Sequence, residues 1–141
     1  MLVLDTGPLL ALLDEGDADH GRCRAMVELV GEPLLVPSVI LPEVNYWVMK
    51  LLSLSVWEGF VEDLIGGAYL FEEVVERDIE RALEIDKTYE ALALGYVDTG
   101  VMALCERLGE PKVATIDLRD FRPVVPAHAT HWTIYPADLG I

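Results

Sequence analysis

The sequence predicts an α/β fold: a three-layer α/β/α sandwich built on a central, mainly parallel sheet. Short apolar runs alternate along the 141 residues with segments of helical periodicity, which is the order of elements in α/β domains. The runs are apolar throughout, as in strands that helices cover on both faces. Hydrophobic residues make up 52% of the chain and charged residues 25%, so the chain can fill one globular core. We expect a single domain over residues 1–141.

The first third of the chain predicts two strands and three helices. In order, these are a strand at Met1–Leu4, a helix at Leu9–Leu13, a helix from Asp19 to Val30, a strand at Leu34–Val36 and a helix from Ser38 to about Leu52. The turn-forming residues 5–8 end the first strand. Asp19 and Ser38 are N-cap residue types, and Gly31 is a C-cap type. Pro42 is tolerable in its helix because it lies near the first turn.

The rest of the chain continues the alternation. We expect a helix from Ser55 to Gly66, a strand at Tyr69–Phe71, an exposed amphipathic helix at Arg77–Leu94, a helix from Asp98 to Gly109, and strands at Val113–Ile116 and Trp132–Tyr135. Ser55 and Asp98 are N-cap types, and glycines end the first and third of these helices. The helix at Arg77–Leu94 has its apolar residues at helical spacing and acid–base pairs on its polar side.

Charge excludes some functions. Twenty-five acids against ten bases give a net charge of −15, which argues against non-specific coating of nucleic acid or of an anionic membrane. Residues 58–90 hold eleven acids and three bases, and residues 99–141 are nearly neutral. The longest run without charge, Pro123–Ala137, contains three prolines and cannot span a bilayer. We see no signal peptide, and two isolated cysteines, Cys23 and Cys105, fit a reduced, cytoplasmic protein.

Four acids stand where a site would form in such a fold, because sites in parallel sheets lie at the carboxyl ends of strands. Asp5 follows the first strand and Asp117 the fourth, while Glu43 and Asp98 lie near helix starts. Each has a structural alternative: Asp5 as a turn residue, Asp98 and Asp117 as helix caps, Glu43 as a partly exposed helix residue. Glu43 fits its alternative least well, because apolar residues flank it at helical spacing and an unpaired charge there is costly.

A gathering of carboxylates without bases needs a cation or protons. At ~4 Å and an effective dielectric constant of ~20, each like-charged pair costs roughly 4 kcal/mol. Oxygen ligands without Cys or His favour Mg²⁺ or Mn²⁺ over Zn²⁺. The chemistry that such a site supports is metal-assisted hydrolysis of phosphodiesters.

Four segments carry a family resemblance. They are Val3–Asp14, Val36–Val44, Tyr96–Cys105 and Val113–Phe121. In this order and at this spacing they resemble the PIN-domain ribonucleases, and most closely the VapC-type toxins of toxin–antitoxin pairs. The resemblance implies an endoribonuclease, a hydrolase whose Mg²⁺ or Mn²⁺ is held by a catalytic acidic cluster. The ligands that it implies are Asp5, Glu43, Asp98, Asp117 and, as a fifth ligand or a structural cap, Asp120.

Further residues are expected near this cluster. The resemblance makes the hydroxyls of Thr6 and Thr115 helpers at the site. Arg119, Arg122 and Lys112 are the bases closest to it in sequence, and they are expected to contact phosphate unless they are solvated loop charges. His20 is expected to be structural, and His128 and His131 to lie in a loop. Gly100, a poor helix former, allows either the close approach of another group or tight helix packing.

The resemblance also implies partners. An RNA substrate, a homodimer and a basic antitoxin that docks in a groove of the third and fourth helices are expected, and no membrane. A basic antitoxin complements the charge of −15. Two alternatives stay open: a non-catalytic PIN-fold module that binds RNA or protein, and a PIN nuclease in RNA processing outside a toxin–antitoxin pair. A phosphoaspartate receiver lacks its second Asp and its Lys here, and an aspartate-nucleophile phosphatase would need Asp where Gly7 stands.

Overall fold

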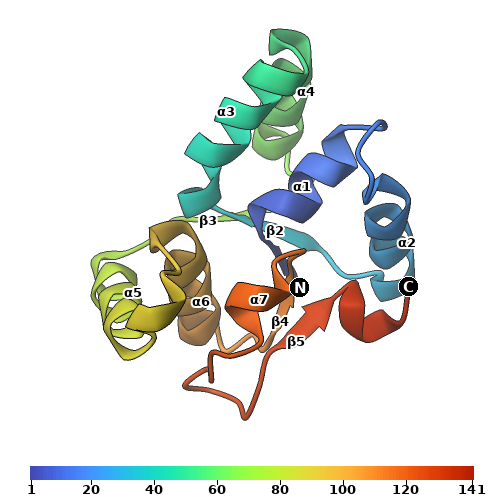
Figure 1. Ribbon diagram of the computed structural model, residues 1–141. Coiled ribbons are helices and arrows are strands. Elements are labelled where there is room, and N and C mark those ends of the chain that lie inside the picture. Colours follow the sequence, from blue (N-terminus) through green and yellow to red (C-terminus); the bar gives the residue numbers. More distant parts are fainter.

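The computed structural model describes residues 1–141 and is built on one five-stranded sheet (Figure 1). The strands are β1 (Leu2–Leu4), β2 (Leu34–Pro37), β3 (Leu70–Glu72), β4 (Lys112–Ala114) and β5 (Thr133–Tyr135). Their order across the sheet is β3-β2-β1-β4-β5, and all four pairings are parallel. The predicted α/β fold with a parallel sheet is confirmed. The order changes direction at β1, which places the carboxyl ends of β1 and β4 side by side.

Helices cover both faces of the sheet. They are α1 (Thr6–Leu13), α2 (His20–Val30), α3 (Leu41–Leu51), α4 (Leu54–Ile65), α5 (Glu76–Thr88), α6 (Tyr96–Leu108) and α7 (Leu118–Phe121), with 3-10 turns η1 (Ser38–Ile40), η2 (Glu90–Leu92) and η3 (Ala137–Leu139). Figure 1 shows α1 and α2 on one side of the sheet and α5 and α6 on the other, while α3 and α4 form a hairpin that extends away from it. None of these helices is both long and apolar enough to cross a membrane.

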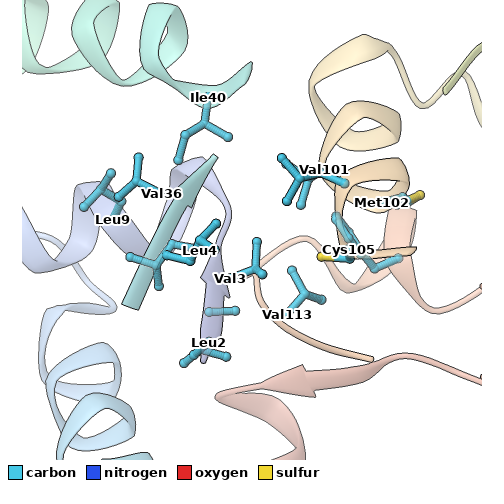
Figure 2. Packing of buried hydrophobic residues seen from close by; sticks show 14 of the residues in the cluster. Leu2, Val3, Leu4, Leu9, Val36, Ile40, Val101, Met102, Cys105 and Val113 are labelled. Carbon is cyan, nitrogen blue, oxygen red and sulfur yellow. The ribbon is translucent and has the colours of Figure 1, made fainter. Parts of the chain in front are cut away.

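The core lies on both sides of the central strand. Leu2, Val3 and Leu4 of β1 have no solvent exposure, and they belong to a cluster of 25 buried residues. In Figure 2, residues of α6 pack toward β1 and β4 from one side, and Leu9 of α1 lies on the other. Burial on both faces explains why β1 has no polar residue among its three. Cys105 is in this core, and both cysteines are buried and free.

Helix starts depart from the predictions in three places. The cap of α4 is Ser53, whose hydroxyl accepts the N–H of Val56, rather than Ser55. Ser38 does not cap a helix, because its hydroxyl accepts the N–H of Val74 and the chain makes a 3-10 turn before α3. Asp98 lies within the first turn of α6, which begins at Tyr96.

Two elements are shorter than predicted and one was not foreseen. The helix predicted to run to Leu94 ends at Thr88, and Ala93 takes a left-handed backbone with φ of 50°. The fourth strand ends at Ala114 rather than at Ile116. The short helix α7 follows it, with Asp117 at its N-cap.

Part of the acidity of residues 58–90 ties α5 to α6 rather than facing solvent. Asp78 is 1% exposed and accepts hydrogen bonds from Nε of Arg107 at 3.0 and 3.1 Å. Arg81 makes a two-pronged pair with the largely buried Glu106 at 2.7 and 3.1 Å. These pairs hold α6, and with it Asp98, at a fixed place over the sheet.

Gly100 brings α6 close to η1. A Cβ atom at this position would lie 3.0 Å from Cγ2 of Val39, so the residue serves tight packing between α6, which carries Asp98, and the turn that leads into α3. We expect Gly100→Val to lower the free energy of unfolding by about 1–3 kcal/mol, the cost of overpacking. Gly59→Ala, in α4 with nothing near its Cβ position, is the control, and it is expected to gain up to about 1 kcal/mol. Urea denaturation measures both, and a Gly100→Val protein as stable as wild type would contradict the packing account.

Candidate metal site

Asp5 lies at the end of β1, where the strand gives way to α1. It caps α1, since its Oδ1 accepts the N–H of Thr6 at 2.8 Å, and its Oδ2 accepts the hydroxyl of Thr115 at 2.8 Å. The residue is 6% exposed. Burial raises the pKa of Asp5 to about 6 against the lowering effect of both hydrogen bonds, and the charges of Glu43 and Asp117 add to the rise.

Three further carboxylates meet beside it. The oxygens of Asp98, Asp117 and Asp120 lie within 4.8 Å of one another. Asp98 comes from the first turn of α6, and Asp117 caps α7 by accepting the N–H of Asp120 at 3.3 Å. Burial, a hydrogen bond with Asp120 and the charges of Asp5, Asp120 and Asp117 raise the pKa of Asp98 to about 8. Burial and Asp120 also raise the pKa of Asp117.

Glu43 of α3 lines the same cleft. It lies half-buried in the first turn of α3. Together with Asp5, Asp98 and Asp117 it lines an open cleft of about 450 Å³, to which Trp47 and Leu10 contribute apolar wall. Four carboxylates from separate parts of the chain therefore converge on one cleft at the carboxyl edge of the sheet, with Asp120 adjoining Asp98 and Asp117.

Nothing basic neutralises this cluster. None of the five carboxylates forms an ion pair with Lys, Arg or His, although the chain makes such pairs elsewhere. Burial, to which the neighbouring carboxylate charges add, raises the pKa of Asp5 to about 6 and that of Asp98 to about 8. The donor set is oxygen alone, which fits Mg²⁺ or Mn²⁺.

The predicted helper hydroxyls both lie at this site. Thr115 links two acids: its hydroxyl donates to Asp5 and accepts the N–H of Asp117 at 3.0 Å. The Thr6 hydroxyl is buried at the cleft wall and has no partner within the protein. Thr115 therefore positions carboxylates, while Thr6 keeps an unused donor.

The three basic residues that were expected to contact phosphate differ in their position relative to the acidic cleft. Arg119 lies exposed on α7, and its charge acts on the pKa of Asp117. Arg122 is paired with Asp138. Lys112 begins β4 and pairs with Glu32 at 2.7 Å, so it lies at the opposite edge of the sheet, and its expected phosphate contact is wrong.

The histidines lie apart from the cluster. The ring of His20 lies 2.7 Å from the carbonyl of Ala11 and ties α2 to α1, which is the structural role expected of it. His128 packs edge-on against Trp132 in the loop before β5. None of the three histidines belongs to the acidic cluster.

Comparison with known proteins identifies the family, because residues 2–124 match the PIN domain. The chain belongs to the PIN domain family. A relative of this PIN domain is Ribonuclease VapC26 of Mycobacterium tuberculosis, 24% identical over 135 residues that make up 96% of this chain and all of that protein.

Solved structures share the fold of this PIN domain. VapC20 of Mycobacterium tuberculosis, described as a sarcin-ricin loop cleaving toxin, superposes with a TM-score of 0.71 at 18% identity, over 80% of this chain and 87% of that one. A toxin–antitoxin complex from Klebsiella pneumoniae gives 0.69 at 14% identity, over 94% and 100%. VapBC from Salmonella typhimurium, bound to DNA, gives 0.67 at 20% identity, over 95% and 97%.

Proposed function

We propose that this PIN domain, residues 1–141, is a metal-dependent endoribonuclease that hydrolyses RNA phosphodiester bonds as the toxin of a toxin–antitoxin pair. The observation that carries the proposal is the unneutralised cluster of carboxylates in an open cleft at the carboxyl edge of a parallel sheet. RNA as the substrate is supported by the relative named a ribonuclease. We expect the protein to act in the cytoplasm, where its substrate is.

The residues that would hold Mg²⁺ or Mn²⁺ are Asp98, Asp117 and Asp120, together with Asp5 and Glu43, which line the same cleft. Such an ion, when bound, activates a water for attack on phosphorus and stabilises the leaving oxygen. Asp5 and Asp98 bind cations only when deprotonated, so they release their protons as the site is filled. Thr115 keeps the Asp5 carboxylate fixed throughout, because its hydroxyl is committed to it.

Two other groups are placed to orient the substrate. The free hydroxyl of Thr6 lies at the cleft wall, where it can donate to a phosphate oxygen or a water. Arg119 lies exposed on α7, next to the helix cap Asp117, and it offers a two-pronged contact to phosphate. Arg122 is less available for substrate because of its pairing with Asp138.

Incubation of RNA with the purified protein tests this function. We expect cleavage in Mg²⁺ or Mn²⁺, none in excess chelator, and recovery when the metal is restored. Cleavage that persists in chelator would rule out the metal mechanism. Lack of cleavage in both metals, with RNA still bound, would favour the alternative of a non-catalytic binding module.

We further propose that a basic antitoxin covers the hairpin of α3 and α4. This hairpin exposes large apolar side chains, which are Tyr46, Trp47, Met49, Leu51, Leu54 and Ile65. Such a patch, on a chain of charge −15, suits a basic amphipathic helix. Two solved structures that share the fold are toxin–antitoxin complexes from Klebsiella pneumoniae and Rickettsia felis.

Co-purification tests the antitoxin. A small basic protein encoded beside this gene is expected to co-purify with the chain and to inhibit cleavage. It is expected not to co-purify with the Leu54→Asp variant. A solitary gene without such a neighbour would favour a nuclease of RNA processing instead. Light scattering on the isolated chain tests the expected homodimer.

A further inference from the structure

A second hollow adjoins the acidic cleft, and its character is different. It has a volume of about 620 Å³ and lies between the start of α3 and the start of α6. Its apolar and aromatic lining residues are Tyr46 and Trp47 of α3, Tyr96 and Val97 of α6, and Val39 and Pro42. We call these six residues the aromatic groove. Its only charged lining residue is Glu43.

The groove and the acidic cleft share a wall. Glu43 and Trp47 line both, and they stand one helical turn apart on α3. An RNA strand with a phosphate among the carboxylates can therefore follow the shared wall and place a neighbouring nucleotide at the groove. The shared wall therefore allows one bound strand to contact both the cleft and the groove.

The aromatic rings are exposed but held in place. Tyr46, Trp47 and Tyr96 keep 54%, 36% and 46% of their surface in solvent. Tyr46 and Trp47 pack edge to face with ring centroids 5.1 Å apart. The ammonium of Lys50 donates to the Tyr46 hydroxyl at 3.2 Å and lies 5.7 Å from the Trp47 ring centre.

Lys50 also supplies a positive charge, which attracts phosphate. Its ammonium lies over the Tyr46 and Trp47 rings and forms no ion pair with an acid, so its positive charge can also attract a phosphate beside the groove. Exposed aromatic faces beside a cation that no acid neutralises are the combination that binds single-stranded nucleic acid, by stacking and by attraction of the backbone.

We propose that the aromatic groove is a nucleobase-stacking subsite, in which Trp47 and Tyr96 hold an unpaired base next to the phosphate in the acidic cleft. This assignment rests on the proposed ribonuclease function and deepens it. The substrate is then a single-stranded or looped RNA segment, because a base inside a helix is not free to enter. Stacking tolerates any base, so the subsite selects for an unpaired strand rather than for a sequence.

Binding of oligo(A) RNA in Mg²⁺ tests the subsite directly. The test uses a Trp57→Phe background, in which the remaining tryptophans are Trp47 and the 2%-exposed Trp132. Stacking is expected to quench Trp47 fluorescence, and Trp47→Leu is expected to weaken binding about 5- to 150-fold. Trp47→Phe keeps an aromatic face and should keep most of the affinity. Leu29→Ala, at a residue of α2 that is 64% exposed and lines neither the groove nor the acidic cleft, is the control and should change nothing.

An abasic oligonucleotide of the same length, which has the sugar-phosphate backbone but no bases, separates the contribution of stacking from that of charge. It is expected to bind without quenching, and with equal affinity to wild type and Trp47→Leu. Oligo(A) that binds both proteins equally, without quenching, would overturn the proposal. Quenching of Trp47 by a basic protein partner but not by oligo(A) would also overturn it, by making the groove a protein-docking site. If Trp47→Leu melts early, Tyr96→Leu on the opposite wall gives the same test.

The two proposals can fail separately. Cleavage without stacking leaves the ribonuclease standing and removes the subsite. Stacking without metal-dependent cleavage keeps the base-binding groove and contradicts the ribonuclease.

Discussion

Asp98→Asn is expected to reduce metal-dependent RNA cleavage at least about 100-fold while the fold is kept. Asp98 contributes an oxygen to the tight cluster with Asp117 and Asp120, and it also faces Asp5. Asparagine has the same shape but cannot supply negative charge, so the cleft binds a divalent cation more weakly and orients it less well. Changing even the residues that support metal ligands costs about 10- to 100-fold, and a ligand itself should cost more.

The control for Asp98→Asn removes the same charge elsewhere. Asp63→Asn lies on the exposed part of α4, outside the cleft, and should cleave at the wild-type rate. Initial rates at saturating Mg²⁺ and melting temperatures of the three proteins give the comparison. Equal rates for Asp98→Asn and wild type would remove Asp98 from the chemistry.

The second large effect is a change in stability with pH that Mg²⁺ reverses. The pKa of Asp5 rises from 3.8 to about 6 in the folded protein. Between these values the folded state holds more protons than the unfolded state, so stability falls as pH rises through that window. A shift of about two units corresponds to about 3 kcal/mol, lost in full above pH ~6. Asp98, with its pKa at about 8, continues the fall in the same direction toward higher pH.

Melting temperatures with and without Mg²⁺, at about pH 5 and about pH 9, measure this effect. We expect the metal-free protein to be less stable at the higher pH, and Mg²⁺ to raise its melting temperature there far more than at the lower pH. Asp5→Asn should be more stable than wild type at about pH 9 without metal, and it should respond weakly to Mg²⁺. A Mg²⁺ response that is the same at both pH values would contradict the linkage.

The parallel sheet was predictable because strands buried on both faces leave a plain signal. Leu2–Leu4 carries no polar residue, and the turn-forming residues after it mark where the strand ends. Helix starts were less predictable. Ser53 and Ser55 are both good caps in sequence, and only the path of the chain out of α3 selects Ser53. The hydroxyl of Ser38 accepts a hydrogen bond from a residue 36 positions away, and the local sequence pattern does not reveal such a contact.

The acidic cleft was predictable to the extent that strand direction fixes where side chains gather. Asp5 and Asp117 follow neighbouring parallel strands, so their closeness follows from the sheet order. The same rule places Lys112, at the start of β4, on the far edge, which the sequence interpretation overlooked. The place of Trp47 in the wall of both hollows could not be predicted, because it depends on how α3 leaves the sheet.

The central claim is that the carboxylates of this cleft cleave RNA. Sequencing of RNA 5′ ends after induced expression of wild type and of Asp98→Asn tests it most directly. The account predicts new 5′ ends at defined, unpaired sites with wild type, and their loss with Asp98→Asn at equal protein levels. The same ends in both cultures, or no new ends with wild type, would contradict it.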